Sequence, residues 1–350
     1  MTGVGDGGPE MGRSLHAVPD IFESTSPALT AGDVSFKELV SIDLIQAKTS
    51  GGEDSKYPER EHFLYAAEIN GVKHVFWHTE ATSSDPNALV VFVKPGLGEI
   101  VEEGIGWKHH KQLARKMPEA EIVSHATFGV GPHGAELSLR DLPAHSMLQM
   151  AEQELELIRE FWGQREVLVV GTSMGTVINH KMGMLNAVSS DPVEIAGIIH
   201  YAPAIVDPKR ILKDMAIGFL PEMIKDGGKE LFGRTRLHHF LGTMAVLAGS
   251  KPRARDLLSM GRQGLDLLKG VPQEEVDALL MHYRTGVIVG IDDPVGQIDM
   301  WEELNPGMVW PVRGGHGIAL KPFQSANKIS KTAAEMGIYT GKPVLEVVRD

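Results

Sequence analysis

The chain of 350 residues contains no cysteine. Disulfide bonds, cysteine-ligated zinc and a thiol nucleophile are therefore excluded. A cysteine-free chain suits a reducing compartment. The first residues also lack the basic and then apolar pattern of a secretory signal. We therefore expect a cytoplasmic protein.

Long apolar runs and an excess of basic residues are missing too. No apolar stretch reaches the roughly 18 residues that a membrane-spanning helix needs. Lys and Arg together number 34 against 46 Asp and Glu, which gives a net charge of −12. Since nucleic acids and anionic membranes are themselves negative, neither is expected as the main partner. The expected partner is a small-molecule substrate.

Apolar patterns predict a β-sheet formed by two segments of the chain, one on each side of a helical insert. Residues 1–33 are rich in Gly, Ser, Pro and Asp, so we expect a poorly ordered arm. In residues 34–204 and 285–350, short apolar runs alternate with helical periodicity. This alternation predicts a mostly parallel sheet with helices on both faces. Near the start of the predicted sheet, Asn70-Gly71 between two apolar stretches predicts a hairpin.

Between these core segments, residues 205–284 show helical patterns only. Such an insert is either a cap over a site or a homodimer interface. Phe219 and Met244 lie in apolar stretches and are candidates to line a substrate pocket. The same stretches would also suit the core of a small helical unit.

One five-residue motif carries most of the chemical information. Gly171, Thr172, Ser173, Met174 and Gly175 fit G-x-S-x-G, between an apolar run and a helical pattern. Strand, sharp turn and helix is the setting in which this motif exposes a serine nucleophile. The glycines permit a turn too tight for Cβ atoms, and the helix N-terminus favours developing negative charge. The alternative is a plain turn that joins a strand to a helix.

A serine nucleophile needs a base, and the base needs an orienting carboxylate. In this architecture both follow later strands, in the order serine, acid, histidine. Asp292 and Asp293 follow one buried strand, and His316, one of 15 histidines, lies between glycines in a later loop. Asp293 is preferred because Pro294 holds its backbone extended. The candidate triad is Ser173, His316 and Asp293, with Asp292 as the second choice for the acid.

Acyl transfer also requires N–H donors for the oxyanion. Met174, directly after the serine, is the first candidate. The second is Leu97, in the glycine-containing loop 94–99 that follows the continuous apolar run 88–93. The alternative for this loop is a simple glycine turn.

A G-x-G-x-x-G pattern at residues 129–134 is not expected to bind NAD. A dinucleotide site needs a helix that opens at once and an acidic residue about 20 positions further on. Pro132 has no N–H for a phosphate, and the next helical pattern starts only near residue 144. HExxH, EF-hand and P-loop patterns are absent from the sequence. We expect neither a cofactor nor a metal.

With these motifs in place, the chain resembles the α/β-hydrolase family with an inserted helical cap. The resemblance spans about residues 36–331 and rests on segments 94–99, 171–175, 290–295 and 314–317. It implies an α/β fold with a mostly parallel, doubly wound sheet of about eight strands.

The chain departs from the family pattern at two positions. Pro95-Gly96 stands where many relatives have His-Gly, and Thr176 stands where many have a small residue, which implies slightly looser packing of helix on strand. Ser173 argues against the dehalogenase and epoxide-hydrolase branches, which use an aspartate there.

The expected function is that of a serine hydrolase. We expect it to cleave a carboxylic ester of a small or medium apolar acid through an acyl-enzyme. The same triad would serve the hydrolysis of a carbon–carbon bond, a thioester or an amide. A non-catalytic ligand-binding protein with the same fold is the alternative outside the enzymes.

Overall fold

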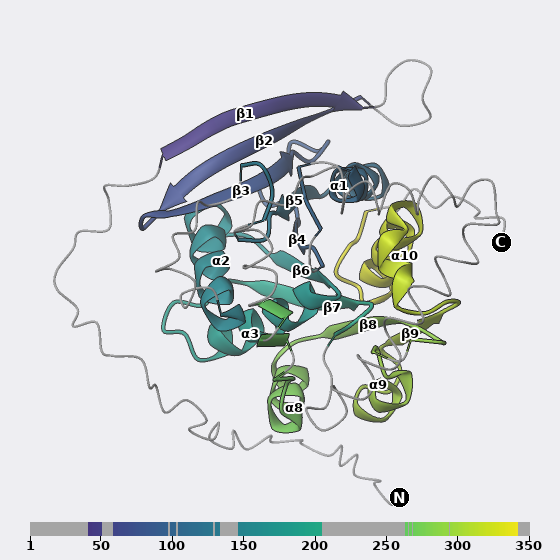
Figure 1. The fold of residues 1–350 in the computed structure, drawn as a ribbon. Coiled ribbons are helices and arrows are strands. Elements are labelled where there is room, and N and C mark those ends of the chain that lie inside the picture. Colours follow the sequence, from purple (N-terminus) through teal and green to yellow (C-terminus); the bar gives the residue numbers. More distant parts are fainter. Residues whose placement is uncertain are drawn as a thin grey trace, which may run out of the picture. The chain divides into compact units, whose positions relative to one another are not determined.

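The apolar runs of the sequence form the strands of one nine-stranded sheet in the computed structural model (Figure 1). The strands are β1 (Ser41–Ser50), β2 (Arg60–Ile69), β3 (Val72–Thr79), β4 (Val90–Lys94), β5 (Glu121–His125), β6 (Val167–Thr172), β7 (Ile195–Tyr201), β8 (Thr285–Gly290) and β9 (Val309–Val312). Their order across the sheet is β1-β2-β3-β5-β4-β6-β7-β8-β9.

The structure describes residues 41–50, 59–96, 99–102, 104–128, 130–133, 146–204, 263–264, 266–267, 269–293 and 295–341. All of them belong to one compact unit, Glu38–Asp350. The predicted arm 1–33, most of the predicted cap 205–284, and Leu97 lie outside the described residues.

The sheet begins antiparallel and continues parallel. β1, β2 and β3 pair antiparallel, and β3 joins β5 in the same sense. The predicted hairpin is confirmed, because Ile69 pairs with Val72 and the turn residues Asn70 and Gly71 both have positive φ. Turns of that kind match the twist of paired strands. The contacts from β5 through β9 are all parallel.

The strand order reverses at β4: the next strand in sequence, β5, pairs with one edge of β4, and the following strand, β6, pairs with the other edge. In open parallel sheets, ligands bind outside the carboxyl ends of the strands at such a switch point. The loop after β4 and the turn after β6 are therefore the places where a site is expected.

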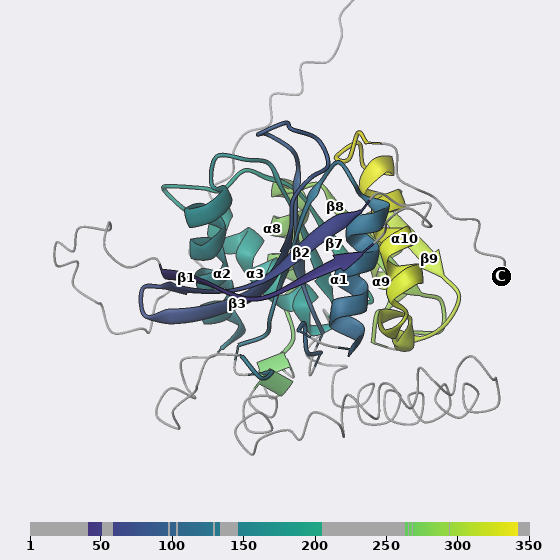
Figure 2. The ribbon, with the colours of Figure 1, turned by 90° about the horizontal axis from the view of Figure 1, so that it is seen from above.

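Helices cover both faces of the sheet (Figure 2). One face carries α2 (Met147–Trp162), α3 (Met174–Ala187) and α8 (Gln273–His282), while the other carries α1 (Gly104–Lys116) and α10 (Pro322–Glu335). The short α9 (Ile298–Leu304) packs Trp301 into the first of these layers. This arrangement confirms the predicted doubly wound architecture, with one strand more than the eight expected.

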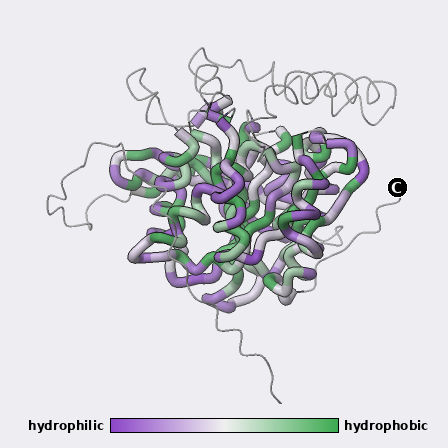
Figure 3. Tube along the Cα trace, turned by 90° about the horizontal axis from the view of Figure 1, so that it is seen from below, coloured by the Kyte–Doolittle hydropathy of each residue, from purple (hydrophilic) through white to green (hydrophobic). Residues whose placement is uncertain are grey.

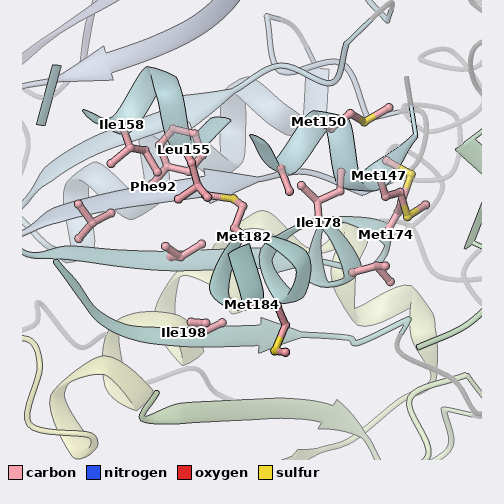
Figure 4. Packing of buried hydrophobic residues seen from close by; sticks show 14 of the residues in the cluster. Phe92, Met147, Met150, Leu155, Ile158, Met174, Ile178, Met182, Met184 and Ile198 are labelled. Carbon is pink, nitrogen blue, oxygen red and sulfur yellow. The ribbon is translucent and has the colours of Figure 1, made fainter. Parts of the chain in front are cut away.

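Successive residues of the central strands feed two separate cores. Val90 and Phe92 of β4 pack under α2 and α3, whereas Val91 and Val93 pack under α1 and α10. A strand buried on both faces needs such a continuous apolar run. Hydrophobic residues accordingly dominate the central segments in Figure 3. Methionines fill much of the first core, as Figure 4 shows for Met147, Met150, Met174, Met182 and Met184.

The last helix of the segment predicted as the cap lies on the core. α8 packs against α3, where Leu279 is the neighbour that a Cβ at Gly183 would strike at 2.4 Å. Glu275 of α8 forms an ion pair with Lys181, and the Tyr283 hydroxyl accepts a hydrogen bond of 3.0 Å from Asn186. α8 is thus part of the layer that covers the sheet.

Candidate active site

Ser173 lies at the sharp turn between β6 and α3. Its backbone has φ 51° and ψ −120°, a conformation that residues with a Cβ rarely adopt. Its N–H donates to the carbonyl of Tyr201 on the neighbouring strand, at 3.0 Å. The half-buried side chain therefore projects from a fixed backbone at the carboxyl end of the sheet.

The two glycines of the motif make this turn sterically feasible. A Cβ at Gly175 would lie 2.4 Å from the Lys94 carbonyl oxygen, and one at Gly171 would lie 2.6 Å from the Gly175 carbonyl oxygen. Both distances are far below ordinary contact. The motif thus has the spacing that close approach of β4, β6 and α3 requires.

His316 begins a short 3-10 helix, η3 (His316–Leu320). It contacts Ser173 although the two residues are 143 positions apart in the sequence. Its Nε2 lies 2.8 Å from the Ser173 Oγ, and its Nδ1 lies 2.9 Å from an Asp293 carboxylate oxygen. When Nδ1–H donates to the carboxylate, Nε2 offers its lone pair to the serine hydroxyl. The imidazole is thereby held in the orientation of a base.

Asp293 follows β8 with its side chain fully buried. One carboxylate oxygen faces His316, and the other accepts a 2.9 Å hydrogen bond from the N–H of Val295. A Cβ at Gly296 would lie only 2.8 Å from the first oxygen, so the glycine leaves room for the acid. Asp292 is exposed instead. Of the two candidates, the structure brings Asp293 to the histidine.

The region expected to hold an oxyanion is described in part. Met174 is the first residue of α3, and the N–H groups of a first helical turn have no partner within the helix. A Cβ at Gly96 would lie 3.3 Å from the Ser173 Cβ, so Gly96 lies directly beside the serine. Leu97, Phe219 and Met244 lie outside the described residues.

Thr176, at the position where many relatives have a small residue, forms two hydrogen bonds through its hydroxyl. Its hydroxyl donates to the Ser173 carbonyl at 2.6 Å and accepts from the Ala204 N–H at 3.1 Å. The second of these bonds ties α3 to the segment after β7. The sequence alone does not assign this hydroxyl a role, because its second partner, Ala204, lies 28 residues away in the chain.

A buried ion pair supports the end of β4, just before the loop beside Ser173. Lys94 and Glu154 of α2 are both inaccessible to solvent and form a salt bridge. The lysine also donates to the Ala126 carbonyl at 3.3 Å. Burial lowers the pKa of Lys94, and Glu154 opposes that shift. Such a pair is costly to break, since either charge alone would be left buried and unpaired.

Potential metal ligands, and part of the segment with the dinucleotide-like pattern, lie in the described residues. Within them, no group of three or more potential metal ligands comes together. After β5, the described residues 130–133 form no helix, and the next helix among the described residues is α2, which begins at Met147. None of the helices in the described ranges combines the length and apolar character needed to cross a bilayer.

Comparison with known proteins gives a likeness of structure only. The sequence matches no protein-family model and no curated protein. A carboxylesterase structure from the thaumarchaeon Nitrososphaera gargenis aligns with 78% of this chain and 98% of that chain, at a TM-score of 0.54 and 15% identity. An esterase structure from Exiguobacterium antarcticum aligns with 77% of this chain and 96% of that chain, at a TM-score of 0.51 and 14% identity. The structure of juvenile hormone epoxide hydrolase from the silkworm Bombyx mori aligns with 82% of this chain and 78% of that chain, at a TM-score of 0.50 and 14% identity.

These likenesses, together with the strand order, define the class of architecture. The chain has the α/β-hydrolase fold. At identities near 15%, the likeness identifies the fold alone, so the chemistry must be argued from the side chains of this chain.

Proposed function

We propose that the protein is a serine hydrolase that works through an acyl-enzyme at Ser173. The observation that carries the proposal is the continuous hydrogen-bonded row from the Ser173 hydroxyl through His316 to Asp293, with distances of 2.8 and 2.9 Å. A serine, a base and a buried orienting carboxylate in this geometry are the parts that nucleophilic acyl transfer needs.

The proposed reaction has two halves. In the first, Ser173 Oγ attacks the substrate carbonyl while its proton passes to His316 Nε2, and the imidazolium then protonates the leaving alcohol. In the second, His316 takes a proton from water, the hydroxide attacks the acyl-enzyme, and the serine leaves with its proton restored. Asp293 keeps Nδ1 protonated and stabilises the imidazolium in both halves.

Each half passes through a tetrahedral oxyanion. We assign its stabilisation to the backbone N–H groups of Met174 and Leu97. Support for Met174 comes from its place at the start of α3, where unpaired N–H groups and the helix dipole favour negative charge. Support for Leu97 comes from the passage of its neighbour Gly96 beside Ser173.

For the substrate, we propose a carboxylic ester of a small or medium apolar acid. Two of the similar structures are a carboxylesterase and an esterase, which favours ester chemistry as the first test. The apolar stretches around Phe219 and Met244 are proposed to line the acyl pocket. Pocket lining controls chain-length preference, since one methylene in an apolar pocket is worth about 1–3 kcal/mol.

A panel of chromogenic esters of increasing acyl length tests this function, with a thioester and an anilide alongside. The wild-type protein is expected to turn over at least one short ester, and Ser173→Ala is expected to lower kcat by roughly 10⁴-fold or more. Turnover confined to the thioester or the anilide would move the substrate class and keep the triad. Lack of turnover on every substrate would leave a ligand-binding protein with this fold.

A further inference from the structure

The loop after β4 is closed by one residue, Glu99, which acts at both ends of a four-residue segment. The Glu99 N–H donates to the Gly96 carbonyl at 3.2 Å. In return, the Gly96 N–H donates to the Glu99 carboxylate at 3.1 Å. The first bond is that of an ordinary turn, but the second adds a side-chain clamp across the same two residues. We call this pair of bonds the Glu99 clamp.

The clamp lies directly beside the nucleophile. The position that a Cβ at Gly96 would occupy is 3.3 Å from the Ser173 Cβ and 3.9 Å from the Glu99 carboxylate oxygen. The residues enclosed by the clamp include Leu97, whose N–H we assign to the oxyanion. A shift of Gly96 would therefore disturb the loop to which we assign an oxyanion donor.

The clamp uses a carboxylate in an environment that disfavours its charge. Burial raises the pKa of Glu99 to about 7, and the hydrogen bond from Gly96 acts against that rise. Within the described ranges, no lysine or arginine forms a salt bridge with this carboxylate. A neutral turn would close this loop at less desolvation cost. An ionisable group with a strongly shifted pKa beside a nucleophile indicates a role in the site.

We propose that Glu99 is a positioning residue that holds Gly96 in place beside Ser173, at the start of the loop to which we assign an oxyanion donor. This assignment rests on the proposed serine hydrolase function. An oxyanion donor acts through preorganised geometry, and removing one such donor costs about 10²- to 10³-fold in kcat. Releasing Gly96 should cost less, about 10- to 100-fold, because no donor is removed.

Three variants at this position and one control separate the clamp from other roles. Glu99→Ala removes the acceptor, Glu99→Asp withdraws it by one methylene, and Glu99→Gln keeps an acceptor oxygen without the charge. Glu166→Ala serves as the control, because this exposed glutamate lies just before β6, at the opposite end of that strand from Ser173.

We expect Glu99→Ala and Glu99→Asp to lower kcat for the best ester by about 10- to 100-fold with KM changed less than about threefold. Glu99→Gln and Glu166→Ala should stay within about threefold of wild type. A trifluoromethyl ketone forms a tetrahedral oxyanion on the serine. Its inhibition constant should therefore weaken in Glu99→Ala by about the same factor as kcat falls.

Some outcomes would overturn the clamp. Wild-type kcat in both Glu99→Ala and Glu99→Asp would remove Glu99 from the site, and an equal loss in Glu99→Gln would show that charge is needed rather than an acceptor. If kcat falls in Glu99→Ala but the ketone binds as tightly as to the wild type, the effect of Glu99 lies outside the oxyanion hole. If Glu99→Ala fails to fold, Glu99→Asp decides the matter.

A measurement independent of turnover keeps this inference distinct from the proposed function. In ¹⁵N-labelled protein, the Gly96 amide proton should be shifted downfield by its bond to the carboxylate. We expect that shift to be lost in Glu99→Ala and kept in Glu99→Gln. An inactive wild type with the Gly96 shift present would reject the hydrolase function while the clamp stands, and an active wild type without the shift would reject the clamp.

Discussion

Buried histidines should make the fold sensitive to mild acid, and His109 offers the cleanest test. This residue of α1 is only 4% exposed, and burial alone lowers the pKa of His109 from 6.5 to about 4. Between these two values the unfolded chain binds a proton that the folded chain does not bind. The free energy of unfolding therefore falls as the pH falls from 6.5 towards 4, and levels off below that.

The size of the effect follows from the shift. Each pH unit in this window changes the free energy of unfolding by at most about 1.4 kcal/mol for one such group. Between pH 7.5 and pH 5.0, His109 should contribute a loss of about 2 kcal/mol. Other buried histidines act in the same direction, since the pKa is lowered to about 4 for His62 and about 3 for His200. The contribution of one residue must be measured as a difference.

Urea unfolding of the wild type and of His109→Gln, followed by tryptophan fluorescence at both pH values, gives that difference. Glutamine does not titrate, so the variant should lose about 2 kcal/mol less than the wild type on acidification. His282→Gln is the matched control, because His282 is exposed, and it should follow the wild type. A gap between His109→Gln and wild type that is the same at pH 7.5 and 5.0 would refute the reasoning.

Three further predictions concern the site. Asp293→Asn should lower kcat by roughly 10³- to 10⁴-fold and Asp292→Asn by far less; kinetics of well-folded variants with the reverse ranking would transfer the acid role. Gly175→Ala, whose Cβ would lie 2.4 Å from a backbone carbonyl oxygen, should lower the free energy of unfolding by about 1–3 kcal/mol. An unchanged urea midpoint would contradict that contact. Phe219→Ala or Met244→Ala should change the acyl-length preference about tenfold or more. If light scattering shows a changed mass while the ester profile stays constant, these residues serve an interface.

Local sequence patterns predicted much of the fold because their causes are local. Asn70-Gly71 favours a hairpin through its own backbone preferences, and the structure has that hairpin. The run before Gly171 is apolar at every position, and β6 is accordingly buried on both faces.

Features that depend on contacts between distant segments could not be predicted from local sequence patterns. Asp292 and Asp293 are neighbours with the same chemistry, and the sequence preference for Asp293 rested on a proline. The structure separates them by the direction of their side chains, since one is exposed and the other lies against His316. The hydroxyl bridge of Thr176 joins segments far apart in the chain, so no local pattern could reveal it.

Helical periodicity likewise predicts a helix without stating what covers its apolar side. Residues 205–284 showed helical patterns, and α8 is a helix within that range. Its contact surface is α3, through Leu279 beside Gly183, and this could not be read from the pattern. The Glu99 clamp was missed for a related reason, because a glutamate three residues after a glycine has no signature until the loop conformation is known.

The most direct test of the central claim is the modification of Ser173 by a fluorophosphonate probe, which reacts with an activated serine. Peptide mass spectrometry of the labelled wild-type protein should find one phosphonyl group, on the peptide that contains Ser173. Ser173→Ala should remain unlabelled, and His316→Ala should label far more slowly because the serine has lost its base. A wild-type protein that stays unlabelled, or that is labelled at another serine, would contradict the account.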